Sequence, residues 1–389
     1  RLRDKGGEAN GWTGYDTAGY SVQVPQRRLP LALEWLAQVV FHPTFPEHKL
    51  AKERQAIASE RALRDPQLVR ILRRLRLTED LELAIHTRLF GYTLEGALGD
   101  DADLKSFTRA ELVDFHWQRY TPANAGLAIV GNVTEDQAAA LAERFFGDLP
   151  ARPAPPEPPV NYPKGPHDVA VHGPLERRQI TLALGARTVG CAHADRWPLE
   201  VLEELLGQRL LAELRFRRGL TYTPWAYNVF HRDSGYFGAQ VTVADRHEDW
   251  ARDTLLGEID ELTQAEPKRR EVRSAARVAW ANWAAADENN YERAATLADQ
   301  ILDWPADQPP PDIAAALAAV TPADIHRVVR AYFVPERRFL GRHTPIFALD
   351  NLAAGLEDRL RDAKRLALLG LGAAAVHLIW QRVARSGKQ

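Results

Sequence analysis

The spacing of hydrophobic residues along the chain predicts alternating helices and strands. Alternating or β-branched apolar residues favour strands over residues 20–25, 180–186 and 236–244. Apolar residues at three- and four-residue spacing predict helices over 28–41, 47–78, 134–147, 196–218, 246–264 and 267–302. Strands separated by helices indicate an α+β protein, in which a mainly antiparallel sheet carries helices packed on one face.

A proline-rich segment divides this pattern into two halves. Residues 150–166 (PARPAPPEPPVNYPKGP) contain eight prolines, which disfavour helix and favour extended polyproline II structure. We therefore expect a first half over 1–149, a linker over 150–166, a second half over 167–345 and a helical tail over 346–389.

The two halves resemble each other. TRAELVDFHWQRYTP (108–122) and TPADIHRVVRAYFVP (321–335) both place an N-capping threonine before an amphipathic helix that ends in tyrosine and proline. A strand-like run follows each of them, over 126–133 and 338–343. We interpret the chain as a tandem duplication of one α/β unit.

Composition narrows the function classes. The 389 residues are 45% hydrophobic, which can form two cores, and the net charge of -2 argues against a nucleic-acid-binding protein. The single cysteine, Cys191, excludes an internal disulfide and a multi-cysteine zinc site. Because the chain starts at Arg1 and contains no methionine, Arg1 is interpreted as a processed terminus or the edge of a fragment.

An apolar run near the C-terminus bears on localisation. Residues 366–380 (LALLGLGAAAVHLIW) are apolar apart from His377 and are flanked by basic residues. This length is short of the ~20 residues of a typical membrane span, although snorkelling side chains can extend it. A membrane anchor and a packed terminal helix both stay open, and so do the cytoplasm and the cell envelope.

No complete catalytic zinc motif occurs in the chain, because neither H-x-x-E-H nor H-E-x-x-H is found. His42 and His48 flank a segment with two prolines, which prevents one helix from presenting both. His167 and His172 lie in a predicted strand at an odd spacing, so their side chains point to opposite faces.

The N-terminal region nevertheless carries an ordered series of short motifs. A Gly-Gly-x-x-Asn-x-x-Thr segment is followed by a second strand, an amphipathic helix, a P-x-F turn and an E-R-x-x-x-x-x-E helix. The matching residues are Gly6, Gly7, Asn10, Thr13, Pro43, Phe45, Glu53, Arg54 and Glu60. This order resembles the insulinase/pitrilysin family of zinc metallopeptidases, which use the inverted H-x-x-E-H motif.

The resemblance implies a zinc ion with Glu60 as one ligand and Glu53 as a carboxylate that orients its surroundings. Their spacing of seven places both carboxylates on one helical face, although the same segment alone also fits an ordinary solvated helix. The two histidine ligands and the general-base glutamate are expected upstream of Arg1. The first repeat is therefore expected to be incomplete.

The resemblance also makes Asn10, Gly11 and Trp12 an edge strand for substrate binding. An exposed edge can pair with an extended peptide through main-chain hydrogen bonds. The family usually has alanine after the asparagine, so Gly11 is a departure, and glycine weakens strand propensity. Trp12 also fits a simple packing role.

The second half contains the segment LLGQRLLAELRFRRGLTYTPWA (205–226), which resembles the family motif L-R-x-x-x-G-L-x-Y. Alone, it also fits a helix end with basic residues and a glycine C-cap at Gly219. The resemblance implies that Arg215 and Tyr222 reach across a cleft toward the substrate. A guanidinium and a phenol can donate hydrogen bonds to a substrate carbonyl and to a developing oxyanion.

These features predict a zinc-dependent endopeptidase in which two repeats close as a clamshell over a peptide or unfolded segment. The chain without its H-x-x-E-H helix is expected to be inactive alone. One alternative is a non-catalytic structural or partner subunit, paired with a catalytic chain or with a second copy. A membrane-tethered interaction domain explains the tail and none of the motifs.

Overall fold

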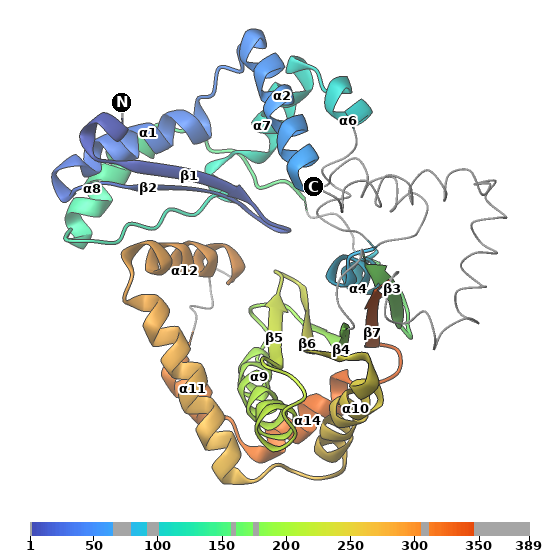
Figure 1. Ribbon diagram of the computed structural model, residues 1–389. Helices are drawn as coiled ribbons and strands as arrows, with labels where there is room; N and C mark the ends of the chain where they lie inside the picture. The colour runs from blue at the N-terminus through green and yellow to red at the C-terminus, as the bar shows by residue number, and fades with distance from the viewer. Residues whose placement is uncertain are drawn as a thin grey trace, which may run out of the picture.

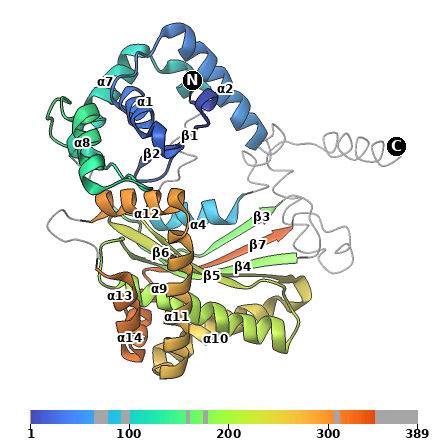
Figure 2. The ribbon, with the colours of Figure 1, turned by 90° about the vertical axis from the view of Figure 1, so that its left-hand side faces the viewer.

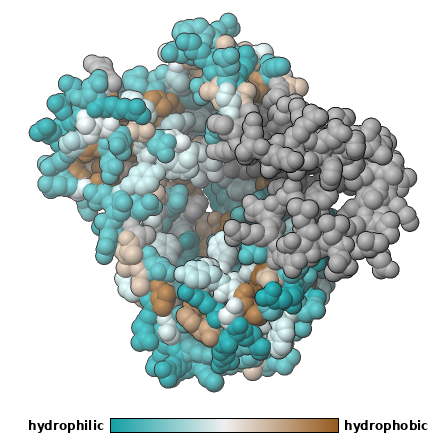
Figure 3. Space-filling model, viewed as in Figure 1, coloured by the Kyte–Doolittle hydropathy of each residue, from teal (hydrophilic) through white to brown (hydrophobic). Residues whose placement is uncertain are grey.

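The computed structural model describes residues 2–64, 79–91, 101–156, 161–173, 179–304 and 311–345. These residues form two lobes (Figure 1). The space-filling view shows the surface hollowed between the lobes beside the part drawn in grey (Figure 3). The arrangement is a clamshell of mixed helices and sheets, as the sequence predicts.

The first lobe contains a two-stranded antiparallel hairpin and the helices around it. Strand β1 (Glu8–Thr13) pairs with β2 (Ala18–Gln23), so that Asn10 lies opposite Ser21. The helices of this lobe are α1 (Leu29–Phe41), α2 (Glu47–Arg64), α6 (Asp101–Ser106), α7 (Arg109–Arg119) and α8 (Glu135–Phe146). Helix α1 covers the hairpin and packs on α8.

The second lobe is built on a five-stranded sheet in the order β3-β7-β4-β6-β5. Its strands are β3 (Val169–Gly173), β4 (Gln179–Val189), β5 (Trp225–Phe230), β6 (Ser234–Ala244) and β7 (Arg338–Pro345). Only the β3–β7 pair is parallel, and the other three pairs are antiparallel. The long central strands follow from the alternating apolar residues of ITLALGA and YFGAQVTVA.

One face of this sheet carries the main hydrophobic core. Inward-facing residues of β4 and β6, such as Leu184 and Phe237, pack on α9 (Arg196–Leu210), α10 (Glu248–Gln264), α11 (Arg269–Asp287) and α14 (Pro322–Tyr332). Two more helices, α12 (Asn290–Asp303) and α13 (Ile313–Ala319), complete the described elements of this half. In α14, Ile325, Val328 and Val329 are buried at three- and four-residue spacing.

The other face of the sheet is covered by a helix from the first half of the chain. Helix α4 (Leu81–Phe90) buries Leu81, Ile85, Leu89 and Phe90 against β3, β4, β6 and β7. Figure 2 shows α4 between the sheet and the elements of the first lobe. The two halves of the chain on either side of residues 150–166 are therefore not separate in their contacts. Helix α4 precedes this segment in sequence, but it packs on strands that follow it.

The matching helices of the two predicted repeats have the same cap. The Thr108 side chain accepts a hydrogen bond from the Glu111 backbone, and the Glu111 side chain accepts one from the Thr108 backbone. Thr321 and Asp324 form the same reciprocal pair at the start of α14. Each pair satisfies backbone N–H groups that a helix start would otherwise leave unbonded.

Three secondary-structure predictions differ from the structure or fall outside it. Residues 126–133 were expected to be a strand, but they belong to none of the strands of the two described sheets. The helix predicted over 267–302 is broken, because the Asn289 side chain caps a new helix by accepting from the Tyr291 backbone. Residues 65–78 of the helix predicted over 47–78 lie outside the described residues.

No helix in the described part of the chain is long and apolar enough to cross a membrane. The predicted anchor at 366–380, and the whole tail over 346–389, lie outside the described residues.

Candidate functional site

Strand β1 has the geometry of an accessible edge strand. It pairs with β2 on one side, and no strand lies on its other side within the described residues. All six of its residues are exposed, including Asn10, Gly11 and Trp12. The Trp12 ring lies over Gly19 on β2, where an added Cβ would fall 2.1 Å from the ring. Trp12 therefore packs within the hairpin, while the edge of β1 away from β2 stays accessible.

Glu53 and Glu60 lie on α2 of the first lobe, and both side chains are exposed. The neighbouring Arg54 anchors this helix by donating a hydrogen bond to the Phe107 carbonyl. Among the described residues, no group of three histidine, cysteine, aspartate or glutamate side chains could hold a metal ion. A catalytic zinc needs three protein ligands, so this part of the chain supplies Glu60 as a single candidate ligand.

Arg215 and Tyr222 are brought together in the second lobe. The Arg215 guanidinium carbon lies 4.2 Å from the centre of the Tyr222 ring, which is cation–π geometry. Arg215 is partly buried, whereas the Tyr222 side chain is 77% exposed. The phenol is therefore available to a ligand, and the guanidinium is held beside it.

The backbone around this pair has two unusual features. Arg215 lies in a π-helical turn, Leu211–Arg217, which continues α9, and such wide turns are frequent at functional sites. The turn ends at Gly219, whose φ of 64° lies in the left-handed region that favours glycine. Hydrogen bonds from Gly219 to the Arg215 carbonyl and from Leu220 to the Leu214 carbonyl close the helix end. This reversal brings Tyr222 back over Arg215.

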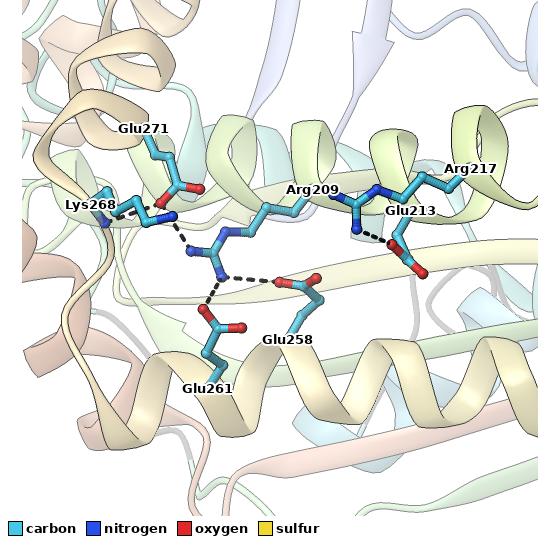
Figure 4. A network of polar contacts seen from close by, with 7 residues as sticks. All are labelled: Arg209, Glu213, Arg217, Glu258, Glu261, Lys268 and Glu271. Atoms are coloured by element: carbon cyan, nitrogen blue, oxygen red, sulfur yellow. Dashed lines mark hydrogen bonds and ion pairs between the residues drawn. The ribbon is translucent and has the colours of Figure 1, made fainter.

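A partly buried ion-pair network fixes the same end of α9. The Arg209 guanidinium contacts Glu258 at 3.0 Å, Glu271 at 3.1 Å and Glu261 at 3.4 Å (Figure 4). Burial alone would lower the pKa of Arg209, but its hydrogen bonds to Glu258 and Glu271 reverse the direction. The network ties α9 to α10 and α11 one turn and a half before Arg215, so it stabilises the helix that presents the arginine.

The tip of the β1–β2 hairpin contacts the second lobe. The Asp16 carboxylate accepts a hydrogen bond from the Arg232 backbone N–H at 3.0 Å and lies 3.5 Å from Nδ1 of His231. The Tyr15 ring stacks on the His86 ring of α4 at a centroid distance of 4.3 Å. Sequence reasoning missed this contact, because Tyr15 and Asp16 lie in an ordinary polar turn.

Two protein-family models match the chain. The model described as "Insulinase (Peptidase family M16)" matches residues 1–82, and the model described as "Peptidase M16 inactive domain" matches residues 106–278. This chain belongs to the insulinase family, M16. The resemblance drawn from the N-terminal motifs and from the L-R-x-x-x-G-L-x-Y segment is confirmed.

Relatives and solved structures extend this comparison. An uncharacterized zinc protease of Mycobacterium leprae is 32% identical over 239 residues, which cover 59% of this chain and 52% of that protein. The chain thus spans about half the length of this curated relative. A protease from Helicobacter pylori has a TM-score of 0.69 at 21% identity, and the match covers 88% of this chain and 84% of that one. The peptidase M16 inactive domain from Pseudomonas fluorescens has a TM-score of 0.70 at 21% identity and coverages of 89% and 83%.

These comparisons establish the peptidase family and the clamshell fold of this M16 chain. The structure places Arg215 beside Tyr222 in the second lobe and Glu53 and Glu60 on α2 of the first. The roles expected of these four side chains, and of the β1 edge, are proposals.

Proposed function

We propose that this M16 chain is the peptide-binding part of a zinc-dependent endopeptidase that acts on peptides or unfolded segments. The observation that carries the proposal is the Arg215–Tyr222 pair, held at 4.2 Å with the phenol exposed. The zinc protease names of the relatives support it.

In this proposal, β1 binds the substrate backbone. An extended peptide adds a third strand to the outer edge of β1 and exchanges main-chain hydrogen bonds with residues near Asn10 and Gly11. Main-chain pairing contributes affinity with little dependence on sequence, which suits unfolded substrates. Trp12 lies against Gly19 within the hairpin and leaves the outer edge of β1 to the peptide.

Arg215 and Tyr222 then orient the substrate from the second lobe. Both groups are hydrogen-bond donors, and a carbonyl oxygen can accept from each of them. The Arg215 charge also stabilises negative charge that develops on that oxygen. The cation–π contact keeps the guanidinium from turning away when no substrate is bound.

The described residues do not complete a zinc site. We propose Glu60 as one ligand and Glu53 as an orienting carboxylate on the same face of α2. The histidine ligands are expected from an H-x-x-E-H helix upstream of Arg1. When bound, zinc would supply a water molecule of lowered pKa as the nucleophile.

Peptide binding can be tested on this chain without zinc. We expect a fluorescein-labelled unstructured peptide to bind, and Arg215→Ala to weaken its affinity about tenfold, because a charged donor is lost. Tyr222→Phe should weaken binding by up to about tenfold through loss of one neutral donor. Fluorescence anisotropy titrations measure both changes.

Arg217→Ala is the matched control for Arg215→Ala. Arg217 belongs to the same π-helical turn, but its side chain pairs with Glu213 at 2.8 Å, so this variant should bind the peptide like the wild type. Equal affinity of the wild type and the Arg215→Ala and Tyr222→Phe variants would contradict the proposed site.

The zinc half of the proposal is tested by reading the coding sequence in frame upstream of Arg1. An H-x-x-E-H motif there would allow the longer chain to be expressed, and its Glu60→Ala variant should lose zinc by atomic absorption. A start codon without the motif would instead favour a peptide-binding partner subunit.

A further inference from the structure

We propose that Glu203 is a positioning residue, which holds β5 against α9 and thereby places Tyr222 opposite Arg215. This inference rests on the proposed function, since it concerns the site that binds the peptide. Glu203 lies on α9, twelve residues before Arg215, and its hydrogen bonds join it to Asn228 of β5.

Glu203 and Asn228 form the junction between helix and strand. Oε2 of Glu203 accepts from the Asn228 backbone N–H at 3.0 Å and from Nδ2 of Asn228 at 2.8 Å. Nδ2 also donates to the Leu199 carbonyl at 2.9 Å. Because β5 is the edge strand of its sheet, the Asn228 N–H would otherwise face outward without a strand partner. The carboxylate thus caps the sheet edge and fixes it to α9.

The contacts show that α9 and β5 run antiparallel, in a defined register. Glu203 meets Asn228, and four residues later Gly207 meets Ala226, whose nitrogen would lie 4.0 Å from an added Cβ on Gly207. Each turn of α9 therefore advances toward the start of β5.

Extending the same register leads to the proposed site. Residues 203 and 207 lie at four-residue spacing along one side of α9, and the π-helical turn Leu211–Arg217 continues the helix to Arg215. Toward the N-terminus from Asn228, β5 begins at Trp225, and Tyr222 lies three residues before this start. The two series converge at the Arg215–Tyr222 contact of 4.2 Å. A shift of β5 along α9 would therefore separate this pair.

Charged neighbours make the junction sensitive to pH. Burial, followed by the charges of Glu200 and Glu204, raises the pKa of Glu203 to about 7, against the opposing hydrogen bonds from Asn228. Glu200 is engaged by Arg196 at 3.0 Å and by Trp283 at 2.6 Å, and Glu204 is engaged by Asn282. Because the buried junction raises the pKa of Glu203, the ionised carboxylate favours the arrangement in which it reaches water, so the junction should be looser above neutral pH.

Hydrogen exchange tests the positioning role without a substrate. In the Glu203→Ala variant, which removes the acceptor, we expect the backbone amides of residues 218–226 to exchange about tenfold faster than in the wild type at about pH 6. Unchanged exchange over 218–226 would overturn the inference, even if the Asn228 amide itself became faster.

Glu204→Ala is the matched control, because Glu204 is the next residue, is also partly buried and accepts from Asn282 of α11 rather than from β5. Exchange over 218–226 should stay at the wild-type rate in this variant. An equal acceleration in both variants would show general loosening of α9 and would also overturn the inference.

Peptide affinity provides the second measurement. Between about pH 6 and about pH 8, wild-type affinity for the labelled peptide should decrease severalfold, while that of the Glu203→Gln variant should stay flat. The same pH dependence in both proteins would contradict the positioning role. If the wild type binds no peptide at either pH, the proposed function fails, and the exchange experiment alone decides the role of Glu203.

Discussion

At the residue scale, the ionisation of Glu203 links the site to the stability of the fold. Burial raises its pKa from 4.5 to about 7. A raised carboxyl pKa means that the folded state prefers the protonated form. The stability contributed by this group is therefore complete below about pH 4.5, and it is lost as the pH rises through about 7.

This loss of stability with rising pH can be measured with the Glu203→Gln variant, whose neutral side chain resembles the protonated form at every pH. Relative to the wild type, the variant should gain about 3 kcal/mol of unfolding free energy between about pH 5 and about pH 8. Urea denaturation across this range measures the difference. A stability difference that does not change with pH would show that Glu203 titrates normally.

The sequence identified some of these residues and missed others for a physical reason. Arg215, Gly219 and Tyr222 are close in sequence, so one short motif contains the whole pair. Glu203 and Asn228 are 25 residues apart, and nothing in their local sequences indicates that they meet. Their contact depends on how α9 packs along β5, and residue patterns do not specify that register.

At the element scale, the β1–β2 hairpin depends on a close fit between Trp12 and Gly19. An added Cβ on Gly19 would lie 2.1 Å from the Trp12 ring. Gly19→Ala should therefore displace the ring and destabilise the protein by about 1–3 kcal/mol. Thermal unfolding and quenching of tryptophan fluorescence measure the two effects.

Gly14→Ala provides the comparison within the same hairpin, because an added Cβ there would meet only the Thr17 carbonyl at an ordinary 3.5 Å. We expect this variant to unfold close to the wild-type temperature. A Gly19→Ala protein with unchanged stability and quenching would show that Trp12 does not pack on Gly19.

Elements were predictable where local chemistry determines them. The capped helices at Thr108 and Thr321 carry their start signals in four residues. The segment over 126–133 has strand-like residues but no strand, because a strand needs a partner and hydrophobic pattern does not supply one. The break before α12 was missed because the helical pattern continues on both sides of Asn289.

At the scale of the whole molecule, the hairpin tip joins the lobes through Asp16. Burial would raise the pKa of Asp16, but hydrogen bonds from His231 and from the Arg232 backbone outweigh it and hold the pKa below its ordinary value. The stability of this contact is therefore present above about pH 4, and it is lost as the pH falls through the lowered pKa.

Asp16→Asn should weaken the contact at neutral pH, because a neutral amide accepts the hydrogen bond from the Arg232 backbone N–H less strongly than a carboxylate does. We expect a larger radius of gyration by small-angle X-ray scattering and faster trypsin cleavage near Arg232. Asp148→Asn, at an exposed position in the same lobe, is the control and should match the wild type. Identical scattering of the Asp16→Asn variant and the wild type at neutral pH would show that this contact does not hold the lobes together.

The position of α4 has a consequence for dividing the protein. Cleavage at the proline-rich segment would leave the second-half fragment with an uncovered apolar face formed by Val171, Tyr236 and Phe339. The other fragment would carry the matching face of α4, including Ile85 and Leu89. Each piece alone should aggregate, whereas the two pieces expressed together should reassemble without a covalent bond, because each buries the surface that the other exposes.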